Sequence, residues 1–214
     1  MINNYFFDFD KTLASSGNAS VSATKEAYKS MGLTVPNTNS ILSYMGIPAE
    51  ISFKKMAVEK LDSKQILQLT DKFRSIYQDV ELQSTKLYPG ILEMLQQLSH
   101  EKKNLFIVSS KKTDAVKRNL KNLKIIGFFN AVVGFDMVKN YKPAPDGILL
   151  LIDIYHLNKV ESIMVGDAKY DIQMGHAAGV KTCGALWDAF DVQGLTKAHP
   201  TYLIDQPKQL LKLE

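Results

Sequence analysis

Several features that define whole classes of proteins are scarce in this sequence. Its 214 residues include a single cysteine, Cys183, so the chain cannot form an internal disulfide and fits a reducing compartment. Because Cys183 lies in the apolar run 180–186, we expect a buried, inert thiol rather than a nucleophile. No apolar stretch is long enough to span a membrane, and the N-terminus lacks the basic-then-apolar pattern of a signal peptide. We therefore expect a cytoplasmic protein with no membrane partner.

Charge of one sign is not concentrated in any part of the chain either. The formal net charge is +4, and the lysines are scattered apart from pairs such as Lys54-Lys55 and Lys111-Lys112. No basic block is interleaved with aromatic residues, so the sequence does not predict nucleic-acid binding. A mild positive excess suits a small anionic substrate. We expect a monomer or a weak homodimer.

From Pro89 onward the chain alternates between apolar runs and stretches with helical spacing. We expect a first strand at 5–9 and further strands at 104–109, 131–135, 162–166 and 180–186. The expected helices cover 88–98, 113–123, 146–155, 171–178 and 207–213. This alternation predicts an α/β fold with a doubly wound, Rossmann-like parallel sheet.

The region between the first strand and residue 85 has a different composition, because strong strand patterns are missing from it. Residues 14–20 are small and polar, as in a hinge or flexible loop, and helical spacing follows at 22–31, 51–61 and 63–79. The block is large enough for a core of its own. We therefore predict an α/β core of residues 1–14 and 85–214, interrupted after its first strand by a small all-helical domain, residues 15–84.

Chemically useful side chains gather where the predicted strands end. The first strand runs into Asp8 and Asp10, which lie two apart and so face the same side of an extended chain. Two carboxylates held this close repel each other unless a cation or a proton lies between them. Because the carboxyl ends of parallel strands face one crevice, Ser109, Lys142 and the acidic stretch 167–171 should lie near this pair.

Each of these residues also has an ordinary structural explanation. Ser109 could cap the helix that follows it, and Lys142 could be a solvated loop lysine. Asp167 and Asp171 could be helix-start acids favoured by the helix dipole, and Thr12 a simple turn hydroxyl. Their joint occurrence, in this order and at strand ends, favours a functional site.

The same stretches resemble the four motifs of the haloacid dehalogenase superfamily. The motifs are Asp8-Phe9-Asp10-Lys11-Thr12-Leu13, then Ser109, then Lys142-Pro143, and last Gly166-Asp167 with Asp171. The helical insert resembles the cap of the first subclass of that superfamily, which includes the phosphoglycolate phosphatases. Residues 177–180 and 201–205 also resemble that branch, so the likeness covers essentially the whole chain.

The resemblance implies a phosphatase that works through an aspartyl phosphate. Asp8 would be the nucleophile, and Asp10 would protonate the leaving oxygen and then deprotonate the hydrolytic water. Ser109 would donate a hydrogen bond to a phosphoryl oxygen, and Lys142 would balance charge on the transferring group. Substrate contacts are implied for Thr12, Ser109, Ser110 and Lys142.

The resemblance also implies a Mg²⁺ site. Its ligands would be the Asp8 carboxylate, the Asp10 backbone carbonyl, Asp167 and Asp171, the last either directly or through water. Mg²⁺ suits an all-oxygen site that keeps waters and bridges to a substrate phosphate. The substrate would be a small phosphorylated metabolite such as phosphoglycolate.

Two stretches raise questions about the turn and about specificity. Lys11 stands where the family usually has glycine, which permits unusual backbone angles and close approach to phosphate. Lys11 would either add charge near the phosphate or point to solvent. Residues 45–48, with Lys54 and Lys55, are candidates for contacting the distal end of the substrate, unless the lysines form a solvated helix face. We expect His176 to be a packed or surface histidine rather than a base.

Other activities on the same machinery stay open. A nucleotidase or pyrophosphatase, or a phosphotransferase similar to β-phosphoglucomutase, would use the same core. Dehalogenase chemistry is disfavoured because it needs neither an acid/base at Asp10 nor a metal cluster. A phosphoreceiver domain also uses acids, a hydroxyl and a lysine, but it is one compact unit whose lysine comes last. A noncatalytic binding protein would be expected to have lost Asp8 or Asp10, and both are present.

Overall fold

The structure, a computed structural model, describes residues 1–214 and is built on a six-stranded sheet. The strands are β1 (Asn4–Phe7), β4 (Asn104–Val108), β5 (Ala131–Val133), β6 (Ser162–Gly166), β7 (Lys181–Ala185) and β8 (Tyr202–Ile204). Their order across the sheet is β5-β4-β1-β6-β7-β8, and every neighbouring pair is parallel. The doubly wound α/β fold is therefore confirmed, with β8 as a strand that the sequence did not predict.

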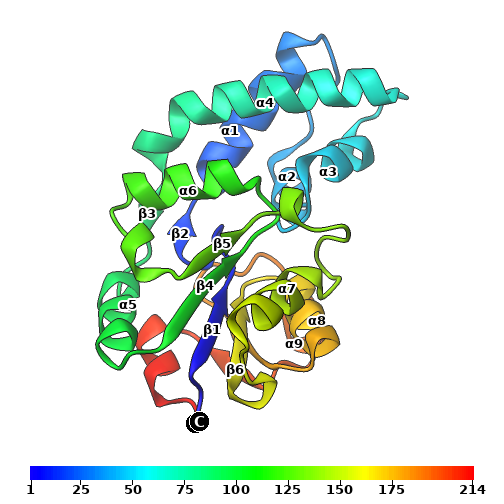
Figure 1. The fold of residues 1–214 in the computed structure, drawn as a ribbon. Coiled ribbons are helices and arrows are strands. Elements are labelled where there is room, and N and C mark those ends of the chain that lie inside the picture. The colour runs from blue at the N-terminus through cyan, green and yellow to red at the C-terminus, as the bar shows by residue number, and fades with distance from the viewer.

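Helices cover both faces of this sheet (Figure 1). They are α5 (Ile91–His100), α6 (Thr113–Asn122), α7 (Asp146–Tyr155), α8 (Lys169–Ala178) and α9 (Val192–Lys197). Short 3-10 helices lie at Ile126–Phe128, Phe135–Met137, Lys159–Glu161 and Pro207–Lys212. Alternate residues of β1 point to opposite faces of the sheet. Tyr5 and Phe7 belong to the apolar cluster with α5 and α6, and Phe6 belongs to the apolar cluster with α7 and α8. The first strand thus lies at the centre of the core.

A helical unit is inserted between β1 and β4. Its helices are α1 (Gly17–Ser30), α2 (Thr38–Ser43), α3 (Ala49–Met56) and α4 (Ser63–Ser84). The chain enters and leaves this unit through a two-stranded antiparallel ribbon, β2 (Ala14–Ser15) with β3 (Lys86–Leu87). Figure 1 shows the four helices together, at the end of the sheet where β1 leads into β2. The helical insert after the first strand is therefore confirmed, and we call it the cap.

The cap has its own apolar core. Ala19, Ala23 and Ala27 recur at every fourth position of α1 and are buried, so small side chains allow α1 to lie close along α4. A second layer forms where Tyr28 meets Phe53 edge to face, with ring centroids 5.7 Å apart. The sequence of α4 begins with a capping box, in which Asp62 and Gln65 satisfy each other's backbone N–H groups.

Several predicted boundaries were wrong. Residues 17–20, expected in a loop, form the first turn of α1, because small residues are what its packed face requires. The helix expected over 51–61 is α3, which ends at Met56, and α4 continues past residue 79 to Ser84. The helices α2 and α9 have six residues each and were not predicted, since fewer than two turns hardly show a period.

Two expectations about composition can be compared with the structure. Cys183 is buried in β7, and burial raises the pKa of its thiol to about 12, in agreement with an inert role. No helix combines the length and apolarity that crossing a membrane requires.

Candidate active site

Three adjacent strands at the centre of the sheet position the predicted acids and hydroxyl. β1 pairs with β4 on one side and with β6 on the other, so the three strand ends lie next to one another. Asp8, Ser109 and Asp167 follow at these ends, and all three are buried. The Asp8 N–H donates to the Val165 carbonyl at 2.9 Å, which extends the ladder by one residue and holds Asp8 at the sheet edge.

Three carboxylates meet at this edge. One oxygen from each of Asp8, Asp167 and Asp171 lies within 4.8 Å of the others. Lys142 Nζ donates to Asp8 Oδ1 at 2.8 Å and to Asp171 Oδ1 at 2.6 Å. Lys142 is only 3% exposed, so it is not a solvated loop lysine. The two acidic stretches of the sequence, which are far apart along the chain, therefore converge on one buried amine.

A glycine makes room for one of these acids. A Cβ atom on Gly166 would lie 2.2 Å from Asp171 Cγ, so only glycine fits at the end of β6. Asp171 Oδ2 also accepts a hydrogen bond from the Ala168 N–H at 3.1 Å, at the start of α8. Asp171 therefore accepts a hydrogen bond at the start of α8 through one oxygen and contacts Lys142 in the acid cluster through the other.

The cluster carries more negative than positive charge. Burial raises the pKa of Asp8 to about 7 against the attraction of Lys142, and Asp171 adds to the rise. Burial, with Asp171 and Asp8 nearby, also raises the pKa of Asp167 well above its usual range. Burial opposes the charged form of Lys142, but Asp171 and Asp8 outweigh it and raise the pKa of the amine. An oxygen-seeking divalent cation would relieve this imbalance, so the three acids fit a Mg²⁺ site.

The raised pKa values predict how the metal-free protein responds to pH. Asp8 titrates near 3.8 ordinarily and near 7 when folded, so between these pH values only the folded state holds the proton. The free energy of unfolding of the metal-free protein should therefore fall as the pH rises from about 4 to 7, and Asp167 acts in the same direction. Mg²⁺ binds the ionised carboxylates, so the stability that it adds should grow over the same window.

Urea unfolding at a series of pH values, with Mg²⁺ or with EDTA, measures both effects. Asp8→Asn should flatten the pH dependence in EDTA, whereas Asp153→Asn, an exposed acid of α7, should leave it unchanged. A constant difference in stability between the wild type and Asp8→Asn from pH 4 to 7 would contradict a raised pKa at Asp8.

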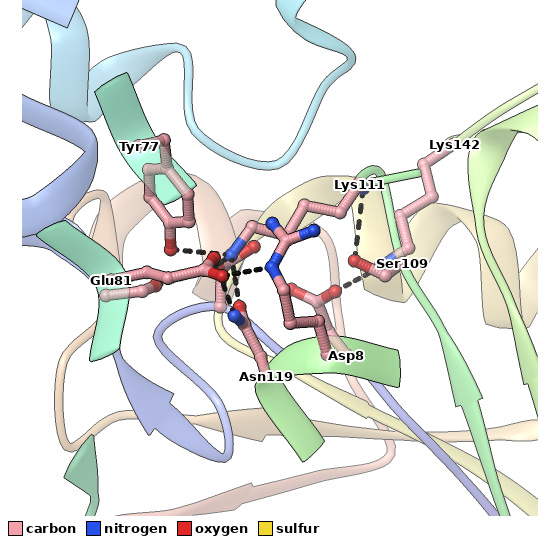
Figure 2. A network of polar contacts seen from close by, with 10 residues as sticks. Asp8, Tyr77, Glu81, Ser109, Lys111, Asn119 and Lys142 are labelled. Atoms are coloured by element: carbon pink, nitrogen blue, oxygen red, sulfur yellow. Dashed lines mark hydrogen bonds and ion pairs between the residues drawn. The ribbon is translucent and has the colours of Figure 1, made fainter. Parts of the chain in front are cut away.

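A second polar network joins the core to the cap through Lys111, Tyr77 and Asn119 (Figure 2), and Asp10 belongs to it. Lys111 Nζ lies 2.8 Å from Asp10 Oδ1, and it donates to the Tyr77 hydroxyl at 2.7 Å and to Asn119 Oδ1 at 3.0 Å. The Ser16 hydroxyl donates to the same Asp10 oxygen. Tyr77 is a residue of α4, so one lysine contacts both the predicted acid/base and the cap.

A buried glutamate strengthens the same connection. Glu81, one turn after Tyr77 on α4, accepts a hydrogen bond from Asn119 Nδ2 at 2.7 Å and forms an ion pair with Arg118 of α6. Sequence reasoning missed Lys111, Tyr77 and Glu81 as site residues. The one available signal was the spacing of Tyr77 and Glu81, which places a hydroxyl and an acid on the same face of the amphipathic helix α4.

The other predicted substrate residues lie in different settings. Ser109 and Ser110 line a cavity between core and cap, together with Asp8 and Asp10. The Ser110 hydroxyl also donates to the Gly46 carbonyl of the cap at 2.6 Å. Thr12 is buried away from that cavity, and its hydroxyl donates to Asp167 Oδ1 at 3.2 Å.

Lys11 keeps the turn geometry that glycine would favour. Its φ of +62° lies in the left-handed region, which costs a non-glycine residue roughly 1–2 kcal/mol. The side chain is buried, and its Nζ lies 2.8 Å from Asp188 Oδ2, so it does not point to solvent. The Trp187 indole N–H donates to the Thr12 carbonyl at 3.0 Å, which ties the same turn to the same neighbouring loop.

The cap candidates divide into two groups. Of residues 45–48, Met45, Gly46 and Ile47 line the cavity and Pro48 does not, so contact of the first three with a substrate stays a prediction. Lys54 and Lys55 are exposed on α3 and do not line it, in agreement with a solvated helix face. His176 is exposed on α8 and lies near the Thr182 hydroxyl, as expected for a surface histidine.

Comparison with known proteins agrees with this geometry. A phosphoglycolate phosphatase of Aquifex aeolicus is 29% identical over 207 residues, which cover 97% of this chain and 94% of the relative. A pyrophosphatase PpaX of Listeria monocytogenes is 27% identical over 217 residues, covering 99% and 96% of the two chains. The solved structure of a haloacid dehalogenase-like family hydrolase from Streptococcus pneumoniae has a TM-score of 0.86 at 27% identity, covering 99% and 97%.

The family match spans most of the chain. The family described as "haloacid dehalogenase-like hydrolase" matches residues 5–185 of this chain. This range includes all four motifs and the whole cap. The chain therefore belongs to the haloacid dehalogenase-like hydrolase family.

Proposed function

We propose that this protein is a Mg²⁺-dependent phosphatase that hydrolyses a small phosphorylated metabolite through an aspartyl phosphate on Asp8. The observation that carries the proposal is the meeting of Asp8, Asp167 and Asp171, with Lys142 bonded to Asp8 and Asp171, beside a cavity that Asp8 and Asp10 line. Phosphoglycolate and pyrophosphate belong in the panel of compounds to be tested, because relatives named for them match nearly the whole chain.

The acid cluster would hold the metal ion. Asp8, Asp167 and Asp171 offer the carboxylate oxygens that Mg²⁺ prefers, and the Asp10 backbone carbonyl would be a further ligand, as the resemblance implies. The bound ion supplies positive charge that lets a carboxylate approach a phosphate group of the same sign. Lys142 keeps a second positive charge beside Asp8, and the Thr12 hydroxyl orients Asp167.

The reaction proceeds in two displacements at phosphorus. In the first, an Asp8 carboxylate oxygen bonds to phosphorus while the bond to the leaving oxygen breaks, and Asp10 gives that oxygen a proton. In the second, a water bonds to phosphorus and gives its proton to Asp10, while the bond to the Asp8 oxygen breaks. The Ser109 hydroxyl donates a hydrogen bond to a phosphoryl oxygen in both steps.

Lys111 positions the Asp10 side chain for both proton transfers. Its Nζ lies 2.8 Å from Asp10 Oδ1, and the Ser16 hydroxyl donates a hydrogen bond to the same oxygen. Because Lys111 also binds the Tyr77 hydroxyl on α4, the acid/base takes its position when the cap lies on the core. Closure over the site also limits the access of water to the phosphoenzyme.

The test is release of inorganic phosphate from a panel of phosphorylated compounds. Phosphoglycolate, pyrophosphate and 4-nitrophenyl phosphate should be compared with Mg²⁺, with EDTA, and with EDTA followed by excess Mg²⁺. We expect release that requires Mg²⁺ and returns when it is restored. A rate unaffected by EDTA, or no release from any compound, would contradict the proposal.

The main alternative on this core is a phosphotransferase. In that case an added sugar phosphate, rather than water, would accept the phosphoryl group from Asp8. Loss of donor phosphate without matching release of inorganic phosphate would indicate this outcome.

A further inference from the structure

The cavity above Asp8 and Asp10 continues into the cap. Its volume is about 240 Å³, below the ~300–1,000 Å³ that sites for drug-sized ligands occupy, so it suits a small molecule. The cap is closed over it, because the Ser110 hydroxyl of the core bonds to the Gly46 carbonyl and Tyr77 bonds to Lys111. A substrate whose phosphate lies at Asp8 therefore has its remaining atoms against the cap wall.

The cap wall is largely apolar. It presents the side chains of Ile41, Met45, Ile47, Phe53, Met56 and Phe73. An uncharged group with an apolar face gains free energy by leaving water for such a wall. A charged group would lose its hydration there and would need a compensating partner.

The cations of the cavity wall already have such partners. Arg74 of α4 forms an ion pair with Glu50, Arg118 with the buried Glu81, and Lys111 with Asp10. Each of these three cations is paired with a carboxylate of the protein itself, so none of the three is left unpaired to bind a second anionic group of a substrate.

Two further charged residues of opposite sign, Lys112 and Asp114, also line the cavity. Both are exposed and lie in the core at the start of α6, and together they add no net charge to the lining. Neutral hydrogen-bonding side chains complete the lining, among them Ser20, Thr24 and Gln78. They can accommodate a hydroxyl or carbonyl group beside an apolar surface.

From these contacts we infer that the cap selects a phosphate monoester of an uncharged alcohol with an apolar or aromatic face. A second anionic group, such as the carboxylate of phosphoglycolate or the second phosphate of pyrophosphate, is disfavoured. This inference rests on the proposed phosphatase function and deepens it by naming the class of substrate.

Binding to a variant that does not turn over substrate tests the inference apart from catalysis. Titration calorimetry of Asp8→Asn with Mg²⁺ should compare phenyl phosphate with phosphoglycolate, since both present the same phosphate end. We expect phenyl phosphate to bind at least ~10-fold more tightly, in proportion to the apolar area that it buries. Equal affinities, tighter binding of phosphoglycolate, or no binding of phenyl phosphate would overturn the inference. Phosphate release by the wild type tests the phosphatase function separately.

A charge placed in the cap wall provides a second test. Ile47 is partly exposed and lies in the loop between α2 and α3, so Ile47→Arg can be introduced without disturbing the buried core. It should tighten phosphoglycolate binding and weaken phenyl phosphate binding, which changes their ratio by ~10-fold or more. The matched variant Ile47→Met keeps an apolar side chain and should keep the wild-type ratio. An unchanged ratio in Ile47→Arg would also overturn the inference.

Discussion

Asp8→Asn is expected to abolish turnover, with kcat reduced by roughly four or more orders of magnitude, as for loss of a covalent nucleophile. A neutral amide does not attack phosphorus, although it fills nearly the same space as the carboxylate. The substitution also removes one of three crowded negative charges, so the metal-free protein should be no less stable than the wild type.

The measurement combines phosphate release with thermal unfolding of both proteins. Asp153→Asn makes the same chemical change at an exposed acid and should keep full activity. Appreciable turnover by Asp8→Asn would place the nucleophile elsewhere. Loss of the folded transition would instead show that Asp8 is needed for structure.

Asp10→Asn is expected to separate the two chemical steps. 4-Nitrophenolate is a good leaving group and needs little protonation, so phosphoryl transfer to Asp8 should still occur. The second step needs a base for water, so steady-state turnover should fall by about 10²–10⁴-fold. We therefore expect a burst close to one equivalent of nitrophenol, followed by a slow steady phase in which the phosphoenzyme accumulates.

Stopped-flow absorbance measures the burst, and mass spectrometry of the quenched protein detects the added phosphoryl group. Ser16→Ala is the matched control, because it removes one hydrogen bond to Asp10 and leaves the carboxylate in place. It should reduce the rate far less and show no burst. A slow Asp10→Asn reaction without a burst or phosphoenzyme would show that Asp10 is not the base of the second step.

The parts of the fold that could be predicted are those with a long or repeated signal. The apolar runs of β1, β4 and β6 and the alternation of strand and helix after residue 85 determine the parallel sheet. The ribbon of β2 and β3 has two residues per strand, too few for any alternation to show. Its pairing depends on contacts between segments that are far apart in the sequence.

In the site, too, some features could be predicted from the sequence and others could not. The positions of Asp8, Asp167 and Asp171 follow from strand ends in a parallel sheet, so their meeting could be expected before any coordinates were known. The direction in which the Lys11 side chain points could not be predicted, because it depends on an ion pair with Asp188, which lies in a loop after β7. Tyr77 fits the apolar spacing of α4, and only its distance to Lys111 separates a site residue from a core residue.

The β2–β3 ribbon has a consequence for how proteins of this design diversify. Both ends of the cap pass through adjacent paired strands, with Ala14 opposite Leu87, so the chain enters and leaves the cap at one narrow junction. Insertions are tolerated where the two connecting ends lie close together at the surface. A lineage could therefore exchange residues 16–85 for another module and keep the Asp8, Asp167 and Asp171 cluster intact, provided that the new module supplies contacts to Asp10 and Lys111 in place of those of Ser16 and Tyr77.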